Sequence, residues 1–316
     1  MAGEASGTGA AGTEVAAVLG EATIIGRRGF ADALAAGLRS GEGFATGKLG
    51  GTERALLREP IIRGSDLSPL QRRAFDLHLR QLALPHAGIF PTDAAFMRRF
   101  CDRFADAVGA LDVIGIDRTA LPETAPLLAH HRPPGALVDY LEQEPDRSIP
   151  ADDRRCWLPL LRGRRILLVC PFATVLCERA DRATYEAVWE KIGKRWFEPA
   201  SVEAVELPYG FDPATRDRYA DALELCEEIV ARIGRHDYDV ALIAAGGLGI
   251  PIAARVRAAG RVGFSIGGHL QPMFGVSGER WLSRPFWREH YINDAWVGLP
   301  ERYRAPSRGA AAEDYW

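Results

Sequence analysis

Residues 237–268 read DYDVALIAAGGLGIPIAARVRAAGRVGFSIGG, and this stretch decides the fold. An apolar run over 237–246 predicts a buried strand, and the glycine-rich turn after it leads into a helical pattern over 250–260. Gly260 ends that helix, and a second apolar run over 261–268 predicts another strand. Two buried strands joined through a helix are typical of parallel neighbours in one sheet.

The same alternation continues on the N-terminal side of this stretch. Strand-like runs at 164–170 and 201–208 alternate with helical patterns at 171–193 and 213–234. The sequence therefore predicts an α/β fold, a mostly parallel Rossmann-like sheet with helices on both faces and a helical N-terminal half. In that half, strands are expected at 44–50 and 111–116, and helices at 28–39, from 51, at 69–84 and at 91–109.

The expected organisation is two α/β halves with a tail at each end. Residues 117–152 are irregular and proline-rich, with a short helix expected within 135–143, and they are interpreted as a hinge between the halves or as surface decoration. A single domain over 15–316 is the alternative. The expected units are a disordered tail at 1–14, an N-terminal half with a helical insertion at 15–150, a Rossmann-like half at 151–281 and a packing tail at 282–316.

Composition and charge exclude several classes of protein. A net charge of -3 with scattered arginines gives no basic stripe for nucleic acid. The five cysteines form no CxxC pair, which argues against structural zinc and fits thiols in a reducing cytosol. The chain shows no signal peptide and no apolar run of membrane-spanning length, so a cytoplasmic protein is expected.

Ligands of open parallel sheets bind beyond the carboxyl ends of the strands, so the segments that follow the predicted strands are the candidate site. Glycine recurs in most of them, and several open a helix whose backbone N–H groups suit an anion. Ordinary turn glycines are the alternative reading. The segments are KLGGTE (48–53), PFATV (171–175), YGFD (209–212), GLGIP (247–251) and GGHLQ (267–271).

Two common nucleotide-binding motifs are absent from the sequence. A dinucleotide fingerprint requires a third glycine where Ile252 stands, and an acidic residue where the next strand ends in Ile266, Gly267 and Gly268. No GK[ST] sequence exists for nucleoside triphosphates. No defensible metal-ligand spacing occurs.

KLGGTE resembles the R-x-G-D-G-E segment of the GT-D-type glycosyltransferases, in which an Asp-x-Glu pair engages a divalent metal and the sugar nucleotide. Further segments resemble related uncharacterised bacterial proteins of glycan-assembly loci. They are WLPLLRGRRILLVCPFATVL (157–176), the stretch from 237 to GGHLQPMFGVSGERW (267–281), NDAWV (293–297) and the terminal DYW. The resemblance covers 44–58 and 157–316, and it implies a nucleotide-sugar glycosyltransferase.

The segment departs from the family pattern at its acidic pair. Lys48 stands at the arginine position, Gly51 replaces the aspartate, Thr52 replaces the second glycine, and Glu53 alone remains. One carboxylate holds Mg²⁺ or Mn²⁺ less well than two, so Glu53 is the metal ligand if there is any. A cationic Lys48 that stabilises the departing diphosphate is the metal-free alternative.

The resemblance implies a hexosyltransferase-like enzyme that moves a sugar from a UDP-, GDP- or dTDP-linked donor to a small-molecule or glycan acceptor. The acceptor group is a hydroxyl, amine or thiol, and natural-product biosynthesis is one setting. A non-catalytic nucleotide-sugar-binding scaffold is the alternative, followed by a nucleotide-dependent oxidoreductase. Nucleic acid and membrane spans are not expected, and a homodimer is left open.

Each candidate catalytic residue has a structural alternative. Glu53 is the candidate acceptor base or ligand of metal or ribose, or a first-turn helix glutamate. Lys48 is the candidate cation, and His269 is a candidate base or a polar filler. Phe172 offers a stacking surface or fills the core, and Arg280 neutralises phosphate or makes a surface salt bridge. The predicted substrate-binding residues are Gly50, Gly51, Thr52, Pro171, Phe172, Thr174, Gly246, Gly247, Gly249, Gly267, Gly268, Gln271 and Arg280.

Overall fold

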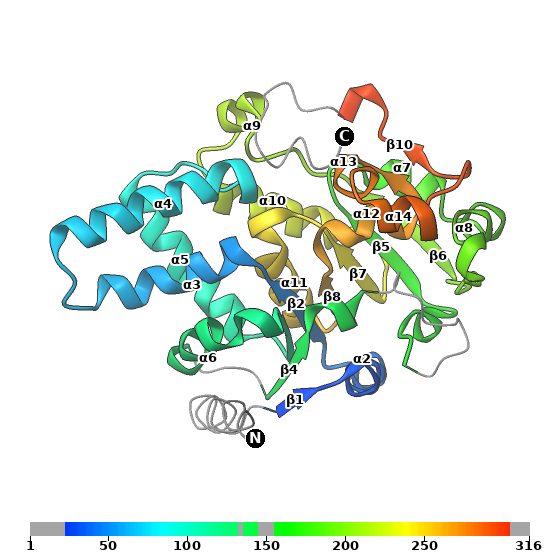
Figure 1. Ribbon diagram of the computed structural model, residues 1–316, viewed down its shortest axis with the longest axis horizontal. Helices are drawn as coiled ribbons and strands as arrows, with labels where there is room; N and C mark the ends of the chain where they lie inside the picture. Colours follow the sequence, from blue (N-terminus) through cyan, green and yellow to red (C-terminus); the bar gives the residue numbers. More distant parts are fainter. Residues whose placement is uncertain (1–22, 132–134, 145–154, 304–316) are drawn as a thin grey trace, which may run out of the picture.

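The computed structural model describes residues 23–131, 135–144 and 155–303, and its centre is one eight-stranded sheet (Figure 1). All pairings in this sheet are parallel, in the order β1-β4-β3-β2-β8-β7-β5-β6, so four strands from each half of the chain join where β2 pairs with β8. The strands are β1 (Thr23–Ile25), β2 (Phe44–Leu49), β3 (Val113–Ile116), β4 (Ala136–Asp139), β5 (Arg165–Val169), β6 (Ser201–Val205), β7 (Val240–Ile243) and β8 (Val262–Ser265).

Helices cover both faces of this sheet, which confirms the predicted α/β Rossmann-like class. We call the two layers face 1 and face 2. Face 1 carries α3 (Gly51–Arg63), α4 (Pro69–Ala87), α5 (Ala94–Gly109), α6 (Leu121–His130), α10 (Ala222–Ile233) and α11 (Gly249–Ala258). Face 2 carries α2 (Arg27–Ser40), α7 (Ala173–Glu178), α8 (Arg182–Val188), α12 (Leu270–Met273), α13 (Glu279–Leu282) and α14 (Pro285–His290). The short α9 (Pro213–Arg218) precedes α10, and a two-stranded sheet pairs β9 (Val276–Ser277) with β10 (Val297–Gly298).

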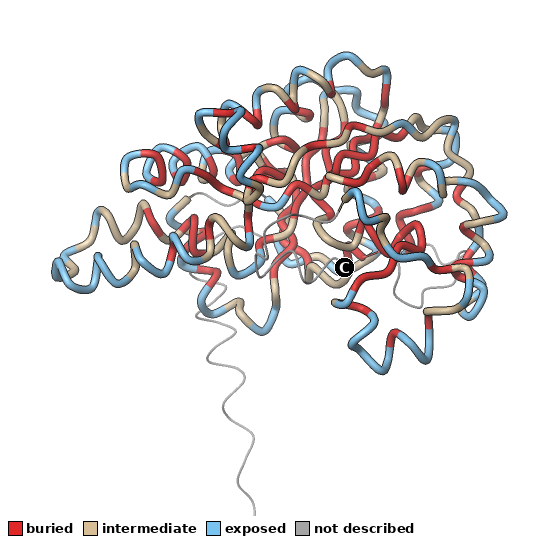
Figure 2. The backbone as a smooth tube through the Cα atoms, turned by 90° about the horizontal axis from the view of Figure 1, so that it is seen from above, coloured by how far each residue is buried: buried red, intermediate tan, exposed pale blue. Residues whose placement is uncertain are grey.

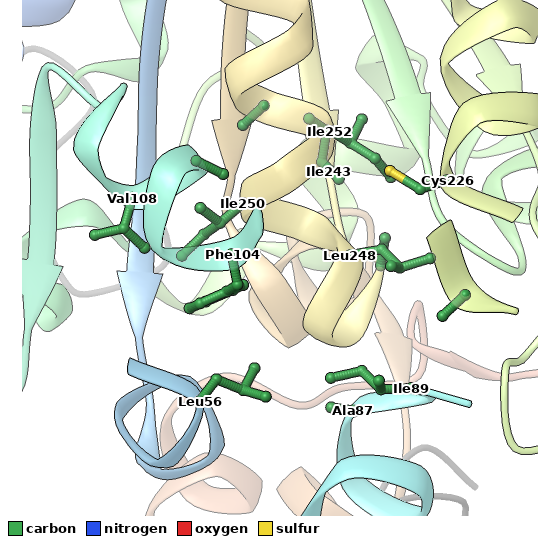
Figure 3. Packing of buried hydrophobic residues seen from close by; sticks show 14 of the residues in the cluster. Leu56, Ala87, Ile89, Phe104, Val108, Cys226, Ile243, Leu248, Ile250 and Ile252 are labelled. Carbon is green, nitrogen blue, oxygen red and sulfur yellow. The ribbon is translucent and has the colours of Figure 1, made fainter. Parts of the chain in front are cut away.

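Each face has its own apolar core, because successive strand residues point to opposite sides of the sheet. In β2, Ala45 and Leu49 join the face 1 core, whereas Phe44 joins the face 2 core. On face 1, Phe104 and Val108 of α5 lie beside α11 (Figure 3). Burial on both sides explains why the central strands read as continuous apolar runs (Figure 2).

At the carboxyl ends of neighbouring strands, the chain continues into helices on opposite faces of the sheet. The chain leaves β2 into α3 on face 1 and leaves β8 toward α12 on face 2. The neighbours β7 and β5 diverge in the same way, into α11 on face 1 and α7 on face 2. Such divergence opens a crevice at the strand ends, where ligands of doubly wound sheets bind.

The interpretation of 117–152 as a hinge or surface decoration is wrong. Within it, Leu121–His130 is a helix and Ala136–Asp139 is β4, an interior strand between β1 and β3. The helix expected within 135–143 is also wrong at its start, because β4 passes directly into a 3-10 turn, η2 (Tyr140–Gln143). The helix expected at 213–234 is interrupted between α9 and α10, where Asp221 caps the second piece.

The C-terminal segment packs on face 2. The Asn293 amide donates to the carbonyl of Ala187 at 3.0 Å, and the Trp296 indole donates to the carbonyl of Val188 at 3.0 Å. The expected packing role of this segment agrees with these contacts. The predicted tail at 1–14 and the terminal DYW lie outside the described residues. Among the described residues, no helix combines the length and apolar character needed to cross a bilayer.

Candidate functional site

A cleft of about 340 Å³ opens at the carboxyl ends of β2 and β8, and we call it the seam cleft. Three cationic residues and bare glycine backbone form much of its wall. The lining residues are Lys48, Leu49, Gly50, Gly51, Glu53, Arg54, Asp117, Tyr140, Glu144, Gly246, Ser265, Ile266, Gly267, Gly268, His269 and Arg280.

The structure brings together residues that the sequence proposed from separate segments. The KLGGTE turn, the GGLG turn and the GGH turn all contribute to the seam cleft, because their strands end at one edge of the sheet. A Cβ added at Gly51 or at Gly267 would meet no atom of the described residues within 4 Å beyond its chain neighbours, so both backbones are open to a ligand. The predicted residues in this cleft are Lys48, Gly50, Gly51, Glu53, Gly246, Gly267, Gly268, His269 and Arg280.

A buried carboxylate that the sequence did not single out organises this cluster. The fully buried Glu144 places its carboxylate 3.4 Å from the Lys48 ammonium and 3.2 Å from Nε2 of His269. The Lys48 ammonium also lies 3.5 Å from Nδ1 of His269. Three polar groups, from β2, from the residue that follows η2 and from the 3-10 turn η6 (Gly267–His269), thus meet at one point of the cleft wall.

The His269 ring lies between the two charged groups. Nδ1 faces the Lys48 ammonium at 3.5 Å, and Nε2 faces the Glu144 carboxylate at 3.2 Å. Both ring nitrogens therefore face protein groups. This geometry favours a positioning role for His269 over the predicted role of a base, because a base needs an accepting nitrogen aimed at the substrate.

The loop that carries Glu144 is fixed by hydrogen bonds from three directions. The Arg27 guanidinium donates to the Glu144 carbonyl at 3.1 Å, and the Trp157 indole donates to the Gln143 carbonyl at 2.9 Å. The buried Gln143 side chain donates to the hydroxyl of Thr46 at 2.8 Å. These contacts hold Glu144 against the end of β2, which makes the cluster a rigid part of the fold.

Glu53 folds back over the first turn of α3. Its carboxylate accepts from the backbone N–H groups of Gly50 and of Glu53 itself at the start of α3. A Cβ at Gly50 would lie 2.7 Å from the Glu53 carboxylate, so this curl depends on glycine. Burial raises the pKa of Glu53 above its ordinary value, while these hydrogen bonds and the nearby Arg54 lower it to a smaller extent. Glu53 therefore fills its structural role and also lines the cleft.

A second, narrower pocket of about 60 Å³ adjoins the seam cleft, and we call it the aromatic lobe. Gly246 and Gly268 line both spaces and lie at the boundary between them. Pro171 and Phe172 lie in this lobe, and the Phe172 side chain is 2 % exposed. The other lining residues are His86, Ala87, Gly88, Leu207, Pro208, Tyr209, Gly210, Phe211, Ala244 and Ala245.

Several predicted ligand residues serve packing instead. Thr174, one of the predicted substrate-binding residues, donates its backbone N–H to the carboxylate of Glu206 at 3.1 Å, and the hydroxyl of Tyr303 donates to the same oxygen at 2.7 Å. Gln271 is fully buried and donates to the Ser277 carbonyl at 3.1 Å, so it fixes its own loop.

The remaining predicted glycines also face protein. A Cβ at Gly247 would lie 2.7 Å from the Ile89 side chain, and one at Gly249 would lie 2.4 Å from the Ser265 hydroxyl. The lack of a side chain at Gly247 therefore lets the end of α4 pack closely, and the lack of one at Gly249 lets α11 pack closely on the sheet. Thr52 is half-buried beside the cleft and lines neither pocket.

The donor set does not fit the divalent metal that the resemblance implies. Among the described residues, no group of three or more His, Cys, Asp or Glu side chains is arranged for an ion. The two cleft carboxylates outside the Lys48 cluster already accept hydrogen bonds, since Glu53 accepts backbone N–H groups and Oδ1 of Asp117 accepts from the N–H and hydroxyl of Thr119. The Thr119 hydroxyl also keeps the pKa of Asp117 below its usual value.

Comparisons with known proteins add no kinship: no family model, curated protein or solved structure matched the chain. The chemistry of the seam cleft and of the aromatic lobe is therefore what indicates the function.

Proposed function

We propose that the protein is a hexosyltransferase-like enzyme that moves a sugar from a nucleotide-sugar donor to an acceptor hydroxyl, amine or thiol. The observation that carries the proposal is the composition of the seam cleft. Lys48 and Arg280 stand with the N-terminus of α3 around bare glycine backbone at a crevice between diverging strands. That combination suits a ligand whose charge is a diphosphate.

Charge stabilisation is the role of the cationic residues. When the bond between the sugar C1 and the diphosphate oxygen breaks, negative charge develops on the leaving diphosphate. Lys48 and Arg280 line the space where that charge would develop, and Glu144 and His269 hold the Lys48 ammonium in place. Groups fixed before the reaction stabilise such charge without reorganisation.

Glu53 is the candidate for moving the acceptor proton. As a bond forms between the acceptor atom and C1, the acceptor loses a proton, and the Glu53 carboxylate at the cleft wall would take it. Burial raises the pKa of Glu53, which makes it a stronger base than an exposed carboxylate. No step requires a metal, so we propose catalysis without Mg²⁺ or Mn²⁺.

The finer assignments belong to this proposal. The donor would carry UDP, GDP or dTDP, the acceptor would be a small molecule or a glycan, and the cytoplasm, where nucleotide sugars are made, would be the compartment. A nucleotide-sugar-binding scaffold is the second candidate, and the backbone hydrogen bonds of Glu53 favour it, because they give this carboxylate a structural role that needs no chemistry.

Substitution of Glu53 separates the two candidates. Glu53→Gln keeps an oxygen for the Gly50 N–H but cannot take a proton, so turnover should fall by about 10²-fold or more with folding intact. Transfer would be followed as release of the nucleoside diphosphate in the presence of acceptor. Wild-type turnover in the variant would remove Glu53 from the chemistry. Tight binding of a nucleotide sugar without turnover on any acceptor would favour the scaffold.

A further inference from the structure

The aromatic lobe contrasts in chemistry with the seam cleft that it joins. Among the described residues, its lining includes no Asp, Glu, Lys or Arg, whereas the seam cleft has six such residues. Leu207, Pro208, Ala244 and Ala245 give it apolar walls. A ligand that spans both spaces would therefore have an apolar end and an anionic end.

A stacked pair of aromatic rings forms one side of this lobe. The rings of Tyr209 and Phe211 lie 5.0 Å apart with an interplanar angle of 23°, and both residues are half-buried. Such a pair presents a flat face that a planar heteroaromatic ring can extend as a third layer. The lobe is much smaller than the seam cleft, at about 60 Å³ against 340 Å³, which favours a flat ring over a chair-shaped sugar.

The segment that carries the two rings is held tightly to the body. A Cβ at Gly210 would lie 1.9 Å from the Gly88 carbonyl oxygen, so the chain between the rings touches the end of α4 backbone to backbone. Gly88 itself has a φ of +68°, the left-handed C-cap of α4. The rings are therefore placed before a ligand arrives, which lowers the cost of binding.

Only small backbone separates the lobe from the cationic residues. Gly246 and Gly268 line both spaces, so an extended group can pass over them without meeting a side chain. We propose that the aromatic lobe binds the nucleobase of the donor, stacked on Tyr209 and Phe211, with the diphosphate over Gly246 and Gly268 toward Lys48. This inference rests on the proposed function and adds the orientation of the donor.

Calorimetric titration of the full chain with UDP, GDP and dTDP tests the assignment. The nucleotide bound best by the wild type should bind about 5- to 100-fold more weakly to Tyr209→Ala and to Phe211→Ala, the range for loss of one base–aromatic contact. Tyr209→Phe keeps the ring and should bind like the wild type. The affinity for inorganic pyrophosphate, which reaches only the cationic residues, should be unchanged in all three variants.

Two further outcomes separate failure of this inference from failure of the proposed function. If nucleotide affinity is unchanged in both alanine variants while the KM for acceptor rises, the lobe binds the acceptor and the assignment is overturned. If the wild type binds none of the three nucleotides, the proposed function itself is overturned. Phe286→Ala, which removes an aromatic ring 54 % exposed on α14, is the matched control and should leave nucleotide affinity unchanged. Equal thermal midpoints would show that the alanine variants are folded.

Discussion

Replacement of Glu144 by glutamine tests the organisation of the site most severely. This carboxylate is fully buried and lies within 3.4 Å of both the Lys48 ammonium and a nitrogen of His269. Glutamine has nearly the same shape but no charge. The Lys48 ammonium, 14 % exposed, would then lie in the cleft wall without the counter-charge that Glu144 supplies.

The size of the effect follows from the geometry. At 3.4 Å and an effective dielectric constant of 20, the attraction between the two charges is about 5 kcal/mol, and desolvation of both groups cancels part of it. Removal of one partner of a buried pair costs about 3–5 kcal/mol. Because Lys48 keeps some contact with water, we expect the lower end, a loss of about 3 kcal/mol in unfolding free energy. For a chain of 316 residues that loss lowers the thermal midpoint by about 4–5 °C.

Urea unfolding at pH 7 measures this difference directly. The matched control is Glu123→Gln, because Glu123 is 68 % exposed and faces Arg58 at 4.0 Å, an ion pair worth less than about 1 kcal/mol. A loss below about 1 kcal/mol for Glu144→Gln, equal to that of the control, would refute the claim that Glu144 organises the cluster.

Three further predictions concern the pKa of Glu53, the absence of a metal requirement, and the packing of Gly43 against Arg257 where the two halves of the chain meet. Because the ionised form of Glu53 is the base and its pKa is raised, kcat/KM should fall as the pH drops through a value above 4.5. The unfolding free energy should rise over the same pH range, because the folded state binds more protons than the unfolded chain. Glu53→Gln should show neither pH dependence. Transfer should persist in EDTA, and a loss restored by Mn²⁺ would contradict the metal-free site. Gly43→Ala should lower the unfolding free energy in urea by more than about 2 kcal/mol, because its Cβ would lie 2.1 Å from the Arg257 carbonyl oxygen. The control Gly41→Ala should cost about 1 kcal/mol, because φ is also positive there but no atom of the described chain lies within 4 Å of the added Cβ. Equal losses in the two variants would contradict the close contact between Gly43 and Arg257.

The strands β5, β7 and β8 could be predicted because their burial on both faces leaves unbroken apolar runs. The strand β4 could not, since it passes directly into η2. Leu137 and Leu141 are four residues apart there, which is the spacing of a helix face, although one lies in a strand and the other in a turn.

Missing β4 also concealed Glu144. Its role depends on Lys48, which is 96 residues away in the chain, and on His269 from a third segment, so no local pattern reveals it. A strand at 136–139 would have placed the following DYLEQE segment at the ligand edge. For the glycines, sequence predicted the position but not the environment. Sequence located the glycine turns, but whether a glycine faces open space, as Gly267 does, or a neighbour, as Gly247 faces Ile89, depends on how the elements around it dock.

The central claim is that the seam cleft binds a nucleotide sugar through its cationic residues. Thermal unfolding with UDP-, GDP- and dTDP-sugars and with NAD tests it most directly, on the wild type and on Arg280→Ala. At 100 times the dissociation constant, one of the sugars should add about 2.7 kcal/mol to the unfolding free energy of the wild type, and clearly less to that of the variant. Stabilisation by NAD alone, or by none of these ligands, would contradict the claim.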